Sequence, residues 1–260
     1  MERRLTANYH THTKYCRHAS GEIEDYIETA IGQGYSVLGF SDHSPYLFRD
    51  GYRSFFRMYP EQQEEYVTEV LRCREKYKGQ IEIPLGYEME YYPRHFEETL
   101  KLIRRFPCDY LVLGQHFLGN EYDGDYSGDR GGEVKLMQYV DQIREGLDTG
   151  VYSCLAHPEL INFDGPREVY EEHMSRLILK AIETETPLEI NLRGQKYGNR
   201  YPDERFIALA ARMGAKFIIG VDAHESSDLE HGREYGEAFA YAEKYSLDLL
   251  DRLPLKKVSD

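Results

Sequence analysis

The feature that most constrains the fold is a regular alternation of apolar, strand-like runs with amphipathic, helix-like runs along the whole chain. In the helix-like runs apolar residues recur every three or four positions, as at Ile23, Ile27 and Ile31. Parallel strands need a long crossover connection, which is usually a helix. Seven such strand-then-helix units therefore predict an α/β fold with a parallel, barrel-like sheet.

The expected elements are short and divide the chain evenly. We expect strands at residues 5–8, 35–43, 81–88, 109–116, 152–158, 187–193 and 216–224. We expect helices at residues 22–33, 60–77, 94–105, 133–149, 167–185, 203–213 and 232–245. Pro84 weakens the third strand, because proline donates no hydrogen bond to a neighbouring strand. No repeat or linker divides the 260 residues, so we expect one domain over residues 1–260.

Composition excludes several classes of protein. The net charge of -14 argues against binding of nucleic acid through a basic surface. No apolar stretch approaches the length of about 20 residues that spans a bilayer. The four cysteines are far apart in the chain, and no secretory leader precedes Tyr9. We therefore expect a reduced, cytoplasmic protein that binds neither nucleic acid nor membranes.

Six of the seven expected strands have histidine, aspartate or glutamate at their carboxyl end or within two residues of it. Catalytic groups of such folds sit at the carboxyl ends of the strands, so these side chains are expected to meet. His10 and His12 point to the same side of an extended chain. The set contains seven histidines and two carboxylates, namely His10, His12, His18, His43, Glu88, His116, His157, Asp222 and His224.

For some members of this set a neighbouring residue is an alternative ligand, and for His18 a surface position without a metal is the alternative. Asp42 is an alternative ligand to His43 or a partner that orients its ring. Glu90 lies two residues after Glu88 and on the same face of the strand. His18 lies in a loop, where a histidine can be an ordinary surface residue. We assign no role to three histidines in or beside helices, His95, His173 and His231.

Nine ligands are too many for one tetrahedral ion, which takes about four protein ligands, or three and a water. Two or three ions must therefore share them. Imidazoles and carboxylates without thiolate suit Zn, Mn or Fe better than Ca or Mg. Clustered ions lower the pKa of bound water towards about 7 and clamp a phosphoryl group. Because only two ligands are carboxylates, the cavity would be positive, which favours an anionic substrate.

The ordered motifs resemble those of the PHP (polymerase and histidinol phosphatase) superfamily over nearly the whole chain. They are His10-Thr-His12, His18, Ser41-Asp42-His43, Gly86-Tyr87-Glu88, His116, Ala156-His157-Pro158 and Asp222-Ala223-His224. Further segments are most similar to the stand-alone histidinol-phosphate phosphatases, namely Arg57-Met58, Leu188-Glu-Ile-Asn191 and Gly220-x-Asp222-Ala-His224. The resemblance implies the PHP fold, a distorted seven-stranded (β/α)7 TIM-like barrel.

The resemblance also implies a centre of three divalent or transition-metal ions, Zn, Mn or Fe. One ion would be held by His10, His12, Glu88 and Asp222. A second would be held by Glu88, His116 and His157, so that Glu88 bridges the two. The third would be held by His18, His43 and His224.

The activity implied is the hydrolysis of L-histidinol phosphate, a small phosphorylated amino alcohol, to L-histidinol and phosphate in histidine biosynthesis. A metal-bridging hydroxide would attack phosphorus directly, with Asp222 and His224 in the catalytic centre. We expect Arg193, at the end of the sixth strand, to bind a phosphate oxygen and to stabilise the charge that develops in transfer. Further candidates for substrate binding are Asn191, Lys196 and Arg49.

Three other functions stay open. The first is hydrolysis of another small phosphomonoester. Binding of histidinol phosphate itself would require an acidic partner for the cationic end of histidinol. Candidates for that partner are Asp50, Asp123 and Asp125 in the long loops. The second is a nuclease module, which the absence of a basic stripe disfavours. The third is a metal-binding protein without catalytic activity.

Overall fold

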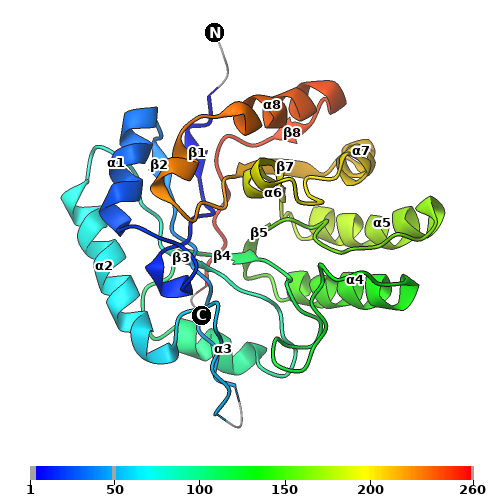
Figure 1. Ribbon diagram of the computed structural model, residues 1–260, viewed down its shortest axis with the longest axis horizontal. Helices are drawn as coiled ribbons and strands as arrows, with labels where there is room; N and C mark the ends of the chain where they lie inside the picture. The colour runs from blue at the N-terminus through cyan, green and yellow to red at the C-terminus, as the bar shows by residue number, and fades with distance from the viewer. Residues whose placement is uncertain (1–3, 49–50, 259–260) are drawn as a thin grey trace.

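Parallel strands occupy the centre of the molecule and helices lie around them (Figure 1). The computed structural model describes residues 4–48 and 51–258. One parallel sheet contains, in chain order, β3 (Gly86–Glu88), β4 (Tyr110–Leu113), β5 (Tyr152–Leu155), β6 (Leu188–Asn191), β7 (Lys216–Gly220) and β8 (Asp248–Leu249). A second parallel pair is formed by β1 (Ala7–Asn8) and β2 (Val37–Leu38).

Isolated bridges connect the two sheets at both sides of the β1–β2 pair. On one side three parallel bridges join the β2 segment to the β3 segment, Val37 to Glu82, Phe40 to Leu85 and His43 to Glu88. On the other side Thr11 bridges to Ala223, and the His12 N–H donates to the Ala223 carbonyl at 2.8 Å. The carboxyl ends of β1, β2, β3 and β7 are thereby brought next to one another.

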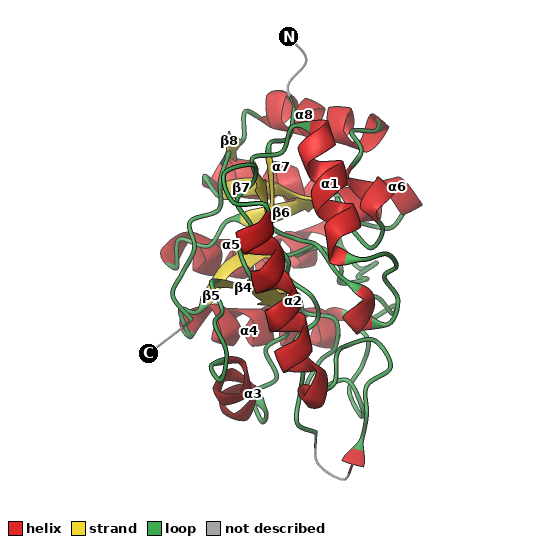
Figure 2. Ribbon diagram, turned by 90° about the vertical axis from the view of Figure 1, so that its left-hand side faces the viewer, coloured by secondary structure: helices red, strands yellow, loops and turns green. Residues whose placement is uncertain are grey.

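The helices follow the predicted alternation, each within a few residues of its expected bounds. They are α1 (Ile23–Gln33), α2 (Gln63–Lys76), α3 (Phe96–Ile103), α4 (Glu133–Asp148), α5 (Arg167–Glu183), α7 (Glu204–Met213) and α8 (Arg233–Tyr245). Short 3₁₀ helices occur at η1 (Lys14–Cys16), η3 (Pro60–Gln62) and η4 (Ser226–Leu229). Figure 2 shows α1 and α2 standing in front of the strands on one side of the molecule.

The predicted end of the sixth strand is wrong. Strand β6 ends at Asn191, whose side chain accepts a hydrogen bond from the Gly194 N–H at 3.0 Å. Asparagine is a favoured residue at this position because its side chain satisfies a free N–H of the first helical turn. Residues 192–197 therefore form an additional short helix, α6 (Leu192–Tyr197), and Arg193 lies on that helix. Strand β8 was also not predicted.

The C-terminal segment closes the end of the sheet that lies opposite the carboxyl ends of the strands. Leu253 packs in a small buried cluster with the inner side chains of the strands, including Tyr9, Tyr110 and Ile218. Beside it, the Lys256 N–H donates to Ser153 Oγ at 2.9 Å at the start of β5. Among the described residues, no helix combines the length and the apolar character needed to cross a membrane.

Candidate metal centre

The nine side chains singled out in the sequence lie together at the carboxyl ends of the strands. Seven of them are buried, His116 is half-buried and His18 is exposed at the rim. They come from the segments that follow β1, β2, β4, β5 and β7 and from the last residue of β3. Side chains separated by more than 200 positions in the sequence therefore share one site.

Glu88 lies at the centre of this group. Its Oε1 atom is 3.0 Å from Nε2 of His157 and 3.6 Å from Nε2 of His116. Its Oε2 atom is 3.1 Å from Nδ1 of His43 and 3.4 Å from Nε2 of His12. The two oxygens thus face different histidines, which is the arrangement that a carboxylate shared between two cations requires.

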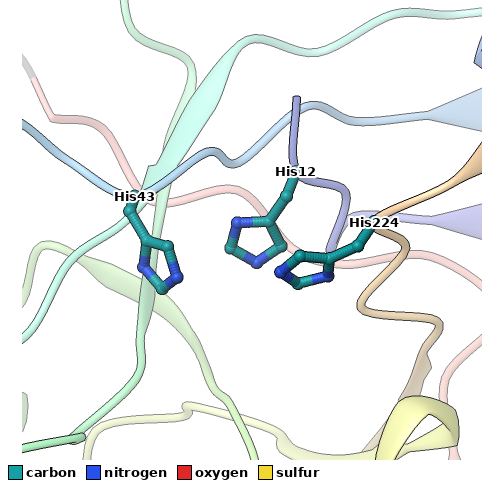
Figure 3. A group of neighbouring side chains, drawn as sticks. All are labelled: His12, His43 and His224. Atoms are coloured by element: carbon teal, nitrogen blue, oxygen red, sulfur yellow. The ribbon is translucent and has the colours of Figure 1, made fainter. Parts of the chain in front are cut away.

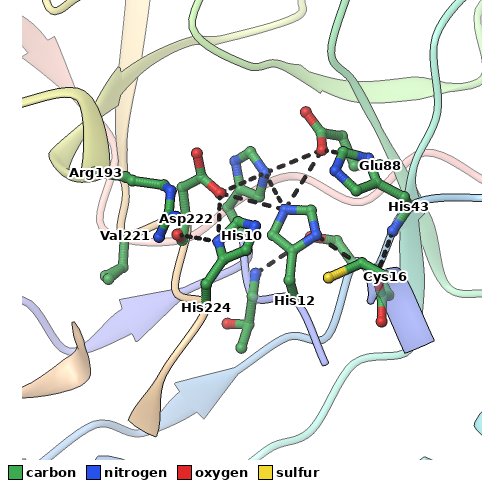
Figure 4. Close-up of polar contacts among 12 residues, drawn as sticks. His10, His12, Cys16, His43, Glu88, Arg193, Val221, Asp222 and His224 are labelled. Carbon is green, nitrogen blue, oxygen red and sulfur yellow. Dashed lines mark hydrogen bonds and ion pairs between the residues drawn. The ribbon is translucent and has the colours of Figure 1, made fainter. Parts of the chain in front are cut away.

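Asp222 contacts two of the histidines on the other side of the group. Its Oδ1 atom lies 3.2 Å from Nε2 of His12 and 3.6 Å from Nε2 of His10. The contacts that link His10, His12, Glu88 and Asp222 are drawn in Figure 4. The rings of His12, His43 and His224 face one another (Figure 3), with centroids 4.4 Å apart for His12 and His43 and 4.2 Å apart for His12 and His224.

Two of the histidines are oriented by buried carboxylates behind them. Nδ1 of His10 lies 2.7 Å from Oε1 of Glu189, and Nδ1 of His116 lies 2.9 Å from Oε1 of Glu90. A carboxylate on one ring nitrogen holds the proton there and leaves the other nitrogen as a donor for a metal. Both rings consequently present Nε2 to Glu88, at 3.6 Å in each case.

Backbone carbonyl groups orient two more rings in the same way. Nδ1 of His18 donates to the Cys16 carbonyl at 2.8 Å, and Nδ1 of His224 donates to the Asp222 carbonyl at 3.0 Å. The second ring nitrogen is then left as the donor of an electron pair. Four of the seven histidines are thus held in the tautomer that binds a cation through Nε2.

The two rival carboxylates have other partners. Asp42 accepts hydrogen bonds from the N–H groups of His43 at 2.7 Å and Thr13 at 3.1 Å, which occupies both of its oxygens. Glu90 lies behind His116 and contacts Arg57 at 2.9 Å. Oδ1 of Asp42 also lies 3.6 Å from Nδ1 of His12, so Asp42 stands behind that ring as Glu90 stands behind His116. His43 and Glu88 contact each other at 3.1 Å within the cluster.

The histidines and carboxylates of the cluster shift one another's pKa values in different directions. Burial raises the pKa of the Glu88 carboxyl, but the imidazoles of His116, His43 and His10 outweigh this and hold that pKa well below its usual range. Burial lowers the pKa of the His43 imidazole well below its usual value. Burial also lowers the pKa of the His10, His12 and His116 imidazoles, but the neighbouring carboxylates outweigh it and raise all three pKa values. Because a cation coordinates ionised carboxylate and neutral imidazole, its binding would displace protons from these three rings.

The distances also fit a group of metal ions. Two ligands of one tetrahedral zinc ion, each about 2.1 Å from it, lie about 3.4 Å apart. The contacts of Glu88 and Asp222 with the rings span 3.0 to 3.6 Å. The groups whose ligand atoms lie within 4.8 Å of one another include His12 with His43 and His224, His10 with Glu88 and His157, and His10 with His12 and Asp222. Two further groups contain a thiol that was not among the predicted ligands, namely Cys16 with His18 and His224, and Cys16 with His12 and Asp42. The donor set therefore fits several transition-metal ions.

A cavity of about 490 Å³ opens above the cluster. One part of its wall is formed by the ligand side chains and Arg193, and another part by apolar and aromatic side chains that the sequence analysis did not select. These are Phe55, Phe56, Phe117, Tyr126, Leu160 and Tyr201. Their only signal in the sequence is their position in loops that follow strands. The cavity thus combines a polar floor with an aromatic rim.

Of the predicted substrate-binding residues Arg193, Lys196 and Asn191, only Arg193 lines the cavity. Arg193 lines the cavity, and its Nη1 atom is 3.8 Å from Oδ2 of Asp228. Lys196 contacts the same aspartate, with Nζ 2.5 Å from Oδ1, but does not line the cavity. The Asn191 amide donates to Asp222 Oδ2 at 3.1 Å and so orients that carboxylate.

The acidic loop residues do not meet the cluster. Asp123 and Asp125 border a separate hollow beside α4 rather than this cavity. Arg49 and Asp50 lie outside the described residues. Glu189 is not among the predicted site residues, although Glu189 and Asn191 alternate with apolar residues in β6 and therefore share one face of that strand.

Comparison with known proteins finds the PHP domain family. The family model, described as "PHP domain", matches residues 8–193. The probable histidinol-phosphatase of Deinococcus radiodurans is 28% identical over 232 residues, which cover 85% of this chain and 86% of that protein. The probable histidinol-phosphatase of Schizosaccharomyces pombe is 28% identical over 271 residues, covering 93% and 87%.

A solved structure shares the fold along almost the whole chain. Histidinol phosphate phosphatase from Lactococcus lactis, complexed with Zn, L-histidinol and phosphate, superposes with a TM-score of 0.74 at 18% identity and covers 96% of this chain and 98% of that one. The predicted α/β PHP fold with a parallel sheet is thereby confirmed. Since the family model spans more than half of the sequence, this protein belongs to the PHP domain family.

Proposed function

We propose that this protein is a metal-dependent phosphomonoesterase that hydrolyses L-histidinol phosphate to L-histidinol and phosphate. The observation that carries the proposal is that Arg193 and eight of the nine cluster residues, all except His10, border one cavity. A guanidinium group binds phosphate oxygens well, and a cation cluster binds the same anion from the other side. The names of the curated relatives and the ligands in the Lactococcus lactis structure support the choice of substrate.

The proposed cofactors are three ions of Zn, Mn or Fe. His10, His12, Glu88 and Asp222 would hold the first, Glu88, His116 and His157 the second, and His18, His43 and His224 the third. The contacts of Glu88 with rings on both of its sides support the first two sites. His18, whose ring centroid is 4.7 Å from that of His224, supports the third.

We also propose that the strands close into a distorted seven-stranded barrel and that residues 1–260 form one domain. The isolated bridges on both sides of the β1–β2 pair support closure. A core cluster that extends from Tyr15 to Val258 supports a single domain. All four cysteines have free thiols, which supports a reducing compartment such as the cytoplasm.

Bound ions would supply a hydroxide at neutral pH and a clamp on the phosphoryl oxygens. Arg193 binds a phosphate oxygen from the wall of the same cavity and offsets the negative charge that develops during transfer. Asn191 holds Asp222 in place, and the aromatic rim excludes water from the organic part of the substrate. Among the described residues that line the cavity there is no serine, threonine or cysteine, which favours direct attack by water over a phosphoenzyme formed on a hydroxyl or thiol group.

The test is phosphate release from L-histidinol phosphate, measured beside p-nitrophenyl phosphate and a nucleoside monophosphate. The protein is first freed of metal with a chelator and then supplied with Zn or Mn. We expect no turnover without metal and, after its addition, a kcat/KM for histidinol phosphate that is orders of magnitude higher than for the other two. Equal, low rates on all three would contradict the substrate, and turnover without metal would contradict the cofactors.

A second candidate is a phosphatase of the same type for a different small phosphomonoester. The specific observation is that, of the described residues lining the cavity, Glu88 and Asp222 are the only carboxylates. Both face the histidine cluster, so the ammonium group of histidinol lacks a separate acidic partner there. A panel of uncharged and cationic phosphate esters distinguishes the two candidates by the ester with the highest kcat/KM.

A further inference from the structure

Arg57 is a buried guanidinium whose partners come from three separate segments. The side chain is 1% exposed. Its Nη1 atom donates to the Ser44 carbonyl at 2.9 Å, its Nη2 atom to Glu90 Oε1 at 2.9 Å, and its Nε atom to Glu121 Oε2 at 2.7 Å. Ser44 follows β2, Glu90 follows β3, and Glu121 belongs to the long loop between β4 and α4. Arg57 thus joins three loops at the carboxyl ends of the strands.

The same network reaches one of the candidate metal ligands. Oε1 of Glu90 accepts the Arg57 hydrogen bond and also lies 2.9 Å from Nδ1 of His116. His116 in turn presents Nε2 to Glu88 at 3.6 Å. A continuous series of hydrogen bonds therefore runs from Glu121 through Arg57 and Glu90 to His116.

Packing holds the guanidinium in this position. Its central carbon lies 4.8 Å from the ring centroid of Tyr46 and 4.5 Å from that of Phe56. Phe56 also stacks on Phe117, with centroids 5.8 Å apart, and both rings line the cavity. The Arg57 guanidinium, which holds the carboxylate behind His116, is therefore also in contact with the aromatic rim.

Only arginine suits this position. A planar guanidinium offers five N–H donors in a fixed fork, so it can bind two carboxylates and a carbonyl at once, whereas a lysine ammonium is a single point charge. A buried charge that loses one of its partners is strongly destabilising. The cost of burying Arg57 is thus offset only while Glu90 and Glu121 both stay in place.

We propose that Arg57 is a positioning residue that couples metal binding at His116 to the order of the loop at residues 119–132. It acts through Glu90, which fixes the His116 ring, and through Glu121, which anchors the loop beside the aromatic rim. The inference rests on the metal centre of the proposed function. Because the coupling is reciprocal, metal at His116 stabilises the loop, and an anchored loop strengthens metal binding.

The experiment compares the wild-type protein with Arg57→Met, Arg57→Lys and Glu121→Gln. Zinc affinity is measured by competition with a chromogenic chelator, and loop order by hydrogen exchange of peptides from residues 117–132 with and without zinc. Loss of a group that orients a metal ligand lowers affinity by about 10- to 100-fold. We expect that loss in Arg57→Met, a smaller loss in Arg57→Lys, and loss of the zinc-dependent protection of the loop in both.

Arg74→Met is the matched control. Arg74 also donates to a backbone carbonyl, that of Ile83 at 2.7 Å, and to a carboxylate, that of Asp109, but at the opposite end of the strands. Its loss is expected to lower stability and to leave zinc affinity and loop exchange unchanged. A loss of zinc affinity in this control as large as in Arg57→Met would overturn the proposal.

A folded Arg57→Met protein with wild-type zinc affinity and loop exchange would also overturn it. If that variant does not fold, Glu121→Gln decides, since it leaves the contacts of Arg57 with Glu90 and Ser44 in place. Zinc-dependent protection of the loop equal to that of the wild type would then reject the coupling. A wild-type protein that binds zinc without hydrolysing histidinol phosphate would contradict the proposed function and leave these comparisons valid.

Discussion

Oε1 of Glu189 lies 2.7 Å from Nδ1 of His10, and both side chains are buried. The other carboxylate oxygen accepts hydrogen bonds from the His157 N–H at 3.0 Å and from the Asn191 amide at 2.9 Å. Glu189 therefore supports two candidate ligands, one from the segment after β1 and one from the segment after β5. A residue that is not among the predicted ligands thus holds part of the site in place.

Replacement of Glu189 with glutamine is predicted to weaken metal binding. The amide can donate to Nδ1 of His10, which removes the preference for the tautomer that binds a cation through Nε2. We expect zinc affinity to fall by about 10- to 100-fold. The measurement is zinc retained after dialysis against a chelator. The control is Glu185→Gln, an exposed position four residues earlier, and equal zinc retention in the two variants would contradict the prediction.

Replacement of Gly114 with alanine is predicted to displace Glu88. A Cβ atom at Gly114 would lie 1.9 Å from Oε1 of Glu88, so the carboxylate has to move. A shift of about 1 Å in an active site can lower activity by about 100-fold, and we expect a loss of kcat/KM of that order. Zinc content, measured on the same samples, is expected to fall as well.

The control for this variant is Gly236→Ala in helix α8. No atom lies within 4 Å of a Cβ placed there. Alanine is favoured over glycine inside a helix by about 0.5 to 1 kcal/mol, so this variant is expected to be slightly more stable and fully active. If the Gly114→Ala protein were as active as this control, the position of the Glu88 carboxylate would not determine activity, and the prediction would be wrong.

Replacement of Arg193 with alanine is predicted to lower kcat/KM for the phosphate ester without loss of metal. Removing one group that stabilises the transition-state charge lowers kcat by about 100- to 1,000-fold. Lys196→Ala is the control, because Lys196 lies on the same helix and contacts the same Asp228 but does not line the cavity. Unchanged kcat/KM in Arg193→Ala would reject a role in phosphate binding.

Replacement of Leu253 with alanine is predicted to destabilise the fold. Leu253 is 5% exposed and packs among the inner side chains of the strands. Truncation of a buried leucine lowers the free energy of unfolding by about 2 to 5 kcal/mol, which urea denaturation measures. Leu255, two residues later, is 40% exposed, so Leu255→Ala is expected to change stability by less than about 0.5 kcal/mol. Equal effects would mean that the segment is not anchored through Leu253.

The sequence by itself determined the order of strands and helices and the residue types at the strand ends. Both are local properties, since the spacing of apolar residues reflects the geometry of each element. Competition between strand and helix at Asn191 also explains why the predicted end of the sixth strand is wrong. The favourable cap at Asn191 begins α6 and takes Arg193 off the strand, although the run remains apolar up to Leu192.

Only the tertiary structure decided which groups stand behind the candidate ligands and what surrounds the cavity. His10 and Glu189 are 179 positions apart, and Glu121 meets Arg57 across 64 positions. Such partners are brought together by the pairing of distant strands and by loop conformation, which leave no periodic signal in the chain. Local patterns therefore predict which side chains reach the carboxyl end of the sheet, whereas long-range packing decides how each of them is oriented there.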